Sequence, residues 1–113
     1  ASPPSNGPPV RRNREKMLTH IVVWKYREEA DAETRRRHVE MLRRLPSVVP
    51  GIESFKVGAD VLRLARSYDT GLVAVFRDRA ALEAYDAHPE HRAVAEFGRT
   101  VSAHVASVDF EDD

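Results

Sequence analysis

The chain has 113 residues, of which 42% are hydrophobic and 32% are charged, a composition typical of one globular domain rather than of a disordered or fibrous protein. It contains no cysteine, which excludes disulfides, thiolate catalysis and cysteine-ligated metal sites and suits a cytoplasmic location. No run approaches the roughly 18 consecutive apolar residues that a membrane span needs, so no membrane partner is expected.

The charges divide unevenly between the first 16 residues and the rest. Of the 18 basic and 18 acidic residues, four basic and one acidic residue lie in residues 1–16, which leaves 14 basic and 17 acidic residues. Such a weakly acidic domain has no electrostatic footprint for nucleic acid, so no nucleic-acid partner is expected. Residues 1–16 also hold four of the seven prolines, and we interpret them as a flexible basic tail before a domain at residues 17–113.

The segment Thr19–Glu28 is rich in β-branched and aromatic residues and is the first predicted strand. Side chains alternate between the two faces of a strand. One face therefore receives His20, Val22, Trp24 and Tyr26, and the other receives Ile21, Val23 and Lys25.

A helix is predicted after this strand. Asp31 has the short acidic side chain that favours an N-cap, and an apolar stripe follows at helical spacing, formed by His38, Val39, Leu42 and Leu45. The stripe predicts a helix running to about Leu45, where Pro46 is expected to end it.

The rest of the chain predicts three strands and an interrupted second helix. The strands are Ile52–Ala59, Thr70–Asp78 and Ser102–Glu111, each short and rich in β-branched or alternating apolar residues. Asp78 is suited to cap a helix from Arg79. A proline in the first turn of a helix loses no hydrogen bond, so His88, just before Pro89, is predicted to separate two helical pieces.

The order β-α-β-β-α-β predicts an α+β fold of the ferredoxin-like type, with helices on one face of a four-stranded antiparallel sheet. The other face would carry Ile21, Val23, Val73 and Val75, which is too apolar for solvent. A second copy of the chain is the simplest cover. The pattern therefore predicts a homodimer through the open sheet face.

The segment Tyr85–Arg92, YDAHPEHR, concentrates titratable side chains. Tyr85 and His91 match one straight helix face poorly, but the break at His88 can turn them toward one point. An imidazole accepts a proton near neutral pH, and a tyrosine hydroxyl can hydrogen-bond a carbonyl or developing enolate oxygen. The pair suits proton abstraction next to a carbonyl. The alternative is that both are buried polar groups satisfied by the backbone.

A metal site is a further alternative for the same segment. His88 and His91 are three residues apart, and His20 or Asp86 could complete a ligand set. However, the cap position already accounts for His88. We therefore expect no metal and no cofactor.

Five segments carry a family resemblance. They are HIVVWKY in the first strand, PGI at Pro50–Ile52, SYD before the third strand, YDAHPEHR, and VDFE near the end. Together they resemble the stress-responsive dimeric α/β-barrel (Dabb) domain family, from Met17 to Glu111, and Y-x-x-H-P-x-H is the most specific element. The resemblance implies that two protomers pack their sheets together as a dimeric α/β barrel.

The family includes polyketide cyclases similar to olivetolic acid cyclase, in which a tyrosine and a histidine act in a cavity between sheet and helices. By motif position, the resemblance implies that Tyr85 and His91 are the catalytic candidates. Trp24, His38 and Leu42 differ from the cyclase in size or type, so the substrate of that enzyme is not transferred. The ligand-binding candidates that the resemblance implies are His20, Val22, Trp24, His38, Leu42 and Leu72.

The leading hypothesis is a homodimer whose cavity binds a small carbonyl-bearing or aromatic molecule. One alternative is a polyketide cyclase-like enzyme with His91 as general base and Tyr85 orienting the carbonyl. Another is a non-catalytic dimer whose role lies in stability or protein contacts. An oxygenase or haem-degrading protein of the wider fold is less consistent with the HPxH element, and fold likeness alone is a weak argument for it.

Overall fold

The computed structural model describes residues 17–111, so the predicted flexible tail at residues 1–16 lies outside the described residues. Within that range the chain alternates strands and helices in the predicted order, with each helix divided in two. None of these helices has the length and apolar character needed to cross a membrane. The elements are β1 (Leu18–Tyr26), α2 (Ala32–Arg43), α3 (Leu45–Val48), β2 (Ile52–Ala59), β3 (Thr70–Phe76), α4 (Arg79–Ala87), α5 (Pro89–Val101) and β4 (Ser102–Glu111).

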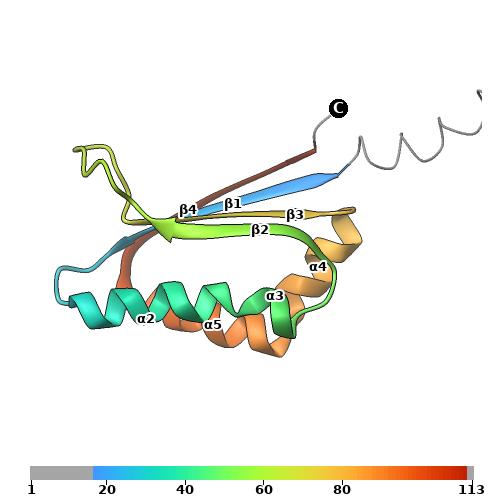
Figure 1. The fold of residues 1–113 in the computed structure, drawn as a ribbon, viewed down its shortest axis with the longest axis horizontal. Helices are drawn as coiled ribbons and strands as arrows, with labels where there is room; N and C mark the ends of the chain where they lie inside the picture. The colour runs from blue at the N-terminus through green and yellow to red at the C-terminus, as the bar shows by residue number, and fades with distance from the viewer. Residues whose placement is uncertain (1–16, 112–113) are drawn as a thin grey trace, which may run out of the picture.

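The strands form one antiparallel sheet in the order β2-β3-β1-β4. The helices cover one face of this sheet and leave the other bare (Figure 1). In the register of the sheet, His20 on β1 lies opposite Ala74 on β3 and Asp109 on β4. The ferredoxin-like fold predicted from the sequence is confirmed.

The hydrophobic core fills the space between the sheet and the helices. Alternation along the strands supplies one side of it, and the apolar stripes of the helices supply the other. Burying a large apolar side chain fully stabilises the fold by about 1.5–3 kcal/mol. The cluster of buried residues comprises Trp24, Tyr26, Leu42, Leu45, Val49, Leu72, Ala74, Phe76, Tyr85 and Val94.

Three helices have an N-terminus that is capped by a side chain, at the positions predicted from the sequence. The carboxylate of Asp31 accepts from the backbone N–H of Thr34 at 2.9 Å, and that of Asp78 accepts from Ala81 at 2.9 Å. The Nδ1 atom of His88 accepts from the N–H of Glu90 at 3.1 Å. These bonds satisfy backbone donors that have no partner within the helix, so His88 is the predicted cap between two helical pieces.

Two predictions about element ends were wrong. Pro46 does not end the first helix: α2 ends at Arg43, and Pro46 lies in the first turn of α3. The position is tolerated because a first-turn proline has no helical hydrogen bond to lose. The strands β1 and β3 also end two residues earlier than predicted, at Tyr26 and Phe76.

The bare face of the sheet is apolar, as predicted. In the β1–β4 register, Ile21 pairs with Val108 and Thr19 with Phe110, so these side chains share the face away from the helices. Val73, Val108 and Phe110 are exposed there. We call this surface the open face, defined by Ile21, Val23, Val73, Val75, Val108 and Phe110.

Candidate functional site

A cavity of about 270 Å³ lies against the helix-covered side of the sheet. Three strands and the helices α2, α4 and α5 contribute to its wall. Seven of the eight site residues predicted from the sequence line it, namely His20, Val22, Trp24, Leu42, Leu72, Tyr85 and His91. The wall also contains Asp86, Ala95, Arg99, Val105 and Ser107, which the sequence prediction did not include.

Tyr85 and His91 face each other across the helix break. Tyr85 lies near the end of α4 and His91 near the start of α5, and their ring centroids are 4.3 Å apart. Tyr85 is 1% exposed, and the tyrosine hydroxyl has no side-chain hydrogen bond within residues 17–111. Unlike Nε2 of His38 and Oγ of Ser102, which are completely buried without a hydrogen-bond partner in the described part of the chain, this oxygen is not completely enclosed by protein atoms. It therefore remains accessible to a molecule in the cavity.

The environment keeps both groups neutral near pH 7. Burial raises the pKa of Tyr85, and the carboxylate of Asp86 raises it further. Burial lowers the pKa of His91, while the carbonyl and carboxylate of Asp86 oppose that shift. The Nδ1 atom of His91 is 3.2 Å from the carbonyl oxygen of Asp86. Because a carbonyl only accepts, Nδ1 carries the proton and Nε2 keeps its lone pair.

A second histidine enters the cavity from β1. The Nδ1 atom of His20 pairs with the carboxylate of Asp109 on β4, and the rings of His20 and Tyr85 meet edge-on with centroids 6.1 Å apart. The sequence prediction missed Asp109. A signal was present, because Asp109 alternates in phase with Val105 and Ser107 on the face of β4 toward the helices.

His38 does not line the cavity, unlike the other ligand-binding candidates. It is fully buried, and its Nδ1 atom lies 2.7 Å from the hydroxyl of Tyr26. The ring of Trp24 contacts His38, with centroids 4.9 Å apart, and takes the place on the cavity wall. Helical spacing assigned His38 to the inward face of α2 correctly, but it could not separate the cavity wall from the core behind it.

A larger hollow of about 540 Å³ lies along α4 and α5. It shares Asp86, His91, Ala95 and Arg99 with the cavity, so the two spaces adjoin at His91. Charged side chains of both signs line this outer hollow. The outer hollow is therefore more polar than the wall of the cavity formed by Val22, Trp24 and Leu72.

The metal alternative receives no support from the side chains. Within residues 17–111, no group of three or more His, Cys, Asp or Glu residues is placed to hold a metal ion. The Nδ1 atom of His88 is used in the helix cap. Asp86 contacts His91 through its carbonyl oxygen and, at 3.8 Å, through its carboxylate.

Comparison with known families gives a match over nearly the whole domain. Residues 18–112 match the family described as the stress responsive A/B barrel domain. None of the curated proteins is similar enough in sequence to count as a relative.

Solved structures with the same fold are dimeric in several cases. A dimeric ferredoxin-like protein of unknown function from Thermobifida fusca is 24% identical, with a TM-score of 0.79, and the match covers 87% of this chain and 92% of that one. A similar dimeric protein from Jannaschia is 27% identical, with a TM-score of 0.72 and coverage of 84% and 98%. Hydroxynitrile lyase from Passiflora edulis is 14% identical, with a TM-score of 0.79 and coverage of 88% and 95%, which shows a shared fold alone.

Proposed function

The chain belongs to the stress responsive A/B barrel domain family, and we propose that it is a homodimer that binds a small carbonyl-bearing or aromatic molecule in the sheet–helix cavity. The observation that carries the proposal is the cavity itself. One part of its wall is apolar, and at another part the ring of Tyr85 lies beside the imidazoles of His20 and His91. A mostly apolar pocket with a few convergent polar groups is the usual form of a small-molecule site.

The size and chemistry of the cavity favour a particular class of ligand. Its volume of about 270 Å³ lies below the usual range for drug-sized ligands, so a single ring with short substituents is the suitable size. Trp24 and Leu72 offer apolar surface to such a ring. The hydroxyl of Tyr85 can donate to a carbonyl oxygen, because its raised pKa keeps it protonated.

Dimerisation is supported by the open face. A contiguous apolar surface that is exposed to solvent usually marks a protein–protein interaction site. The structures of similar fold from Thermobifida fusca and Jannaschia are described as dimeric. Two copies joined by their open faces would leave the cavity on the helix-covered side of each protomer free.

A second candidate function is proton-transfer catalysis, as in a polyketide cyclase-like enzyme. It is favoured by the hydrogen bond from His91 to the carbonyl of Asp86, which leaves the Nε2 lone pair free. His91 would take a proton from the carbon next to a carbonyl, and Tyr85 would donate to the developing enolate oxygen. If substrates are turned over, Tyr85→Phe and His91→Ala should each lower the rate by about 10²–10⁴-fold.

A thermal-shift screen tests the binding proposal. The full chain and a Tyr85→Phe/His91→Ala double variant are compared against aromatic acids, polyketide mimics, acyl-CoA compounds and divalent metal ions. We expect an aromatic or carbonyl compound to raise the melting temperature of the wild type and not of the variant.

The screen also separates the alternatives. Equal shifts in both proteins would place the ligand outside this cavity. No shift with any compound, while the protein remains dimeric, would favour a non-catalytic dimer whose Tyr85 and His91 are structural.

A further inference from the structure

The loop between β2 and β3, residues 60–69, exposes three large apolar side chains close together. Val61 is 86% exposed, Leu62 68% and Leu64 40%. A single exposed apolar residue is ordinary on a protein surface, but three within four positions concentrate exposed apolar surface in one short stretch of the loop. We call these three residues the loop tip.

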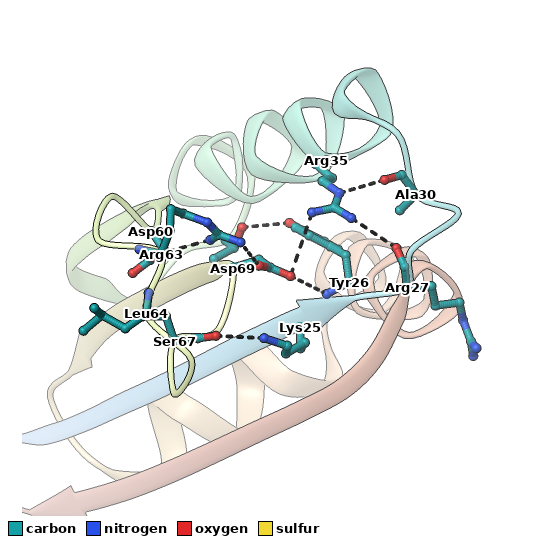
Figure 2. A network of polar contacts seen from close by, with 11 residues as sticks. Lys25, Tyr26, Arg27, Ala30, Arg35, Asp60, Arg63, Leu64, Ser67 and Asp69 are labelled. Atoms are coloured by element: carbon teal, nitrogen blue, oxygen red, sulfur yellow. Dashed lines mark hydrogen bonds and ion pairs between the residues drawn. The ribbon is translucent and has the colours of Figure 1, made fainter.

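Ionic and backbone contacts fasten the base of this loop. The N–H of Asp60 donates to the carbonyl of Asp69 at 2.9 Å. The guanidinium of Arg63 bonds to the carboxylates of Asp60 and Asp69 at 3.2 and 2.7 Å. Asp69 is itself buried and accepts from the backbone N–H of Tyr26 on β1 at 2.8 Å. Figure 2 shows Arg63 reaching between the two aspartates, so the loop is bonded directly to β1, one of the two inner strands of the sheet.

The backbone of the loop is held in an unusual conformation. Arg63 has a φ angle of 51°, in the left-handed region that is unfavourable for a residue with a Cβ atom. Such a conformation persists where the surroundings impose it. The carboxylate of Asp60 does so by accepting from the N–H of Arg63 at 2.7 Å.

The second half of the loop is also fixed. The side chain of Ser67 accepts from the N–H of Leu64 at 3.1 Å, and the ammonium of Lys25 donates to the carbonyl of Ser67 at 2.9 Å. The loop tip is therefore presented to solvent by an ordered segment. A loop whose backbone is already ordered loses less conformational entropy when a partner covers it.

The position of the loop identifies what would cover it. Figure 1 shows the loop rising at the end of β2 on the bare side of the sheet, away from the helices. The open face lies on that same side. We infer that the loop tip is a second part of the homodimer contact, packing against the other copy at the rim of the paired sheets. This inference rests on the dimer proposed above, and two-fold symmetry would form the contact twice.

Sedimentation equilibrium of the full chain over a dilution series tests the inference. The Val61→Asp/Leu62→Asp double variant should raise the dimer dissociation constant by about tenfold or more, because it removes two apolar contacts. Val108→Asp, on the open face, should also raise it. Val48→Asp is the matched control, because Val48 is 46% exposed but lies on α3, in the helix layer. The dimer of the Val48→Asp variant should have the same dissociation constant as the wild type.

The outcomes distinguish the loop contact from the dimer itself. If Val108→Asp weakens the dimer and the double loop variant does not, the loop inference is wrong and the open-face dimer stands. If the wild type stays monomeric over the whole dilution series, the proposed dimer fails and the loop contact fails with it. Circular dichroism verifies that each variant is folded.

A second measurement reports on the tip directly. The chain has no cysteine, so Leu62→Cys can carry an environment-sensitive fluorescent dye at a single position. We expect its emission to shift to the blue as the protein dimerises, while the same dye at Val48→Cys does not change. A dye at position 62 that stays in a water-like environment in the dimer would overturn the inference.

Discussion

The imidazole of His38 meets the indole of Trp24 edge-on, with centroids 4.9 Å apart and ring planes at 84°. Trp24 lines the cavity, whereas His38 is fully buried behind it. His38 is held in turn by the hydroxyl of Tyr26, which also lies 2.9 Å from the hydroxyl of Thr70. A buried polar chain therefore fixes one wall of the cavity, and it does so with a neutral histidine.

The first prediction is that the free energy of unfolding decreases as the pH is lowered, because His38 is buried in its neutral form. Burial lowers the pKa of His38 from 6.5 to about 4. Below pH 6.5 His38 is protonated in the unfolded chain but stays neutral in the folded chain. The stabilisation of the folded state by neutral His38 is therefore complete above pH 6.5 and is lost on acidification toward pH 4. The loss should reach about 3 kcal/mol in the free energy of unfolding. Urea denaturation at pH 7, 5.5 and 4 measures it.

His38→Gln is the matched variant for this measurement. Glutamine does not titrate, so the variant should lose less stability than the wild type between pH 7 and 4, although it starts from a lower value. His91 remains in both proteins, and its lowered pKa contributes in the same direction. Equal losses in the two proteins would show that His38 is not the source.

The second prediction concerns the tautomer of His20. A carboxylate only accepts hydrogen bonds, so Asp109 holds the proton of neutral His20 on Nδ1. Asp109→Asn should release this preference, since an amide can either donate or accept. The free energy of unfolding should change by less than about 1 kcal/mol, because Asp109 is partly exposed.

Nitrogen-detected NMR of the histidine rings at pH 8 checks the tautomer. The wild type should show Nδ1 protonated, and the variant should show a mixture or a proton on Nε2. Glu111→Gln, an exposed change on the same strand, serves as the control and should leave the ring unchanged. An identical His20 spectrum in Asp109→Asn would remove the positioning role of Asp109.

Local patterns predicted most of the fold. The bounds of β2, β4 and α4 match the predicted segments Ile52–Ala59, Ser102–Glu111 and Arg79–Ala87, because alternation, a capping aspartate and a proline break each act within a few residues. The predicted end of the first helix at Pro46 was wrong because proline can either end one helix or occupy the first turn of the next.

The candidate site was less accessible to sequence reasoning. The meeting of Tyr85 and His91 was anticipated, because a short break joins the two helices that carry them. His20 and Asp109 are 89 positions apart in the sequence. Their pairing depends on the register between β1 and β4, and no local sequence pattern specifies that register. The left-handed conformation of Arg63 was likewise not predicted, because no sequence pattern marks a non-glycine residue for a positive φ, although the aspartates that bond to it, Asp60 and Asp69, are near in sequence.

The third prediction tests how tightly the cavity wall is packed. A Cβ atom on Gly98 of α5 would lie 2.8 Å from Nε2 of His38 and 3.0 Å from Nε1 of Trp24. Gly98→Ala should therefore lower the free energy of unfolding by about 1–2 kcal/mol, because overpacking costs more than the roughly 1 kcal/mol that alanine adds to helix propensity. Gly58→Ala is the control, since nothing lies within 4 Å of its added Cβ, and its stability should stay within about 0.5 kcal/mol of the wild type. Urea denaturation of both variants measures the difference, and a Gly98→Ala protein more stable than the wild type would mean that the rings of His38 and Trp24 can move aside.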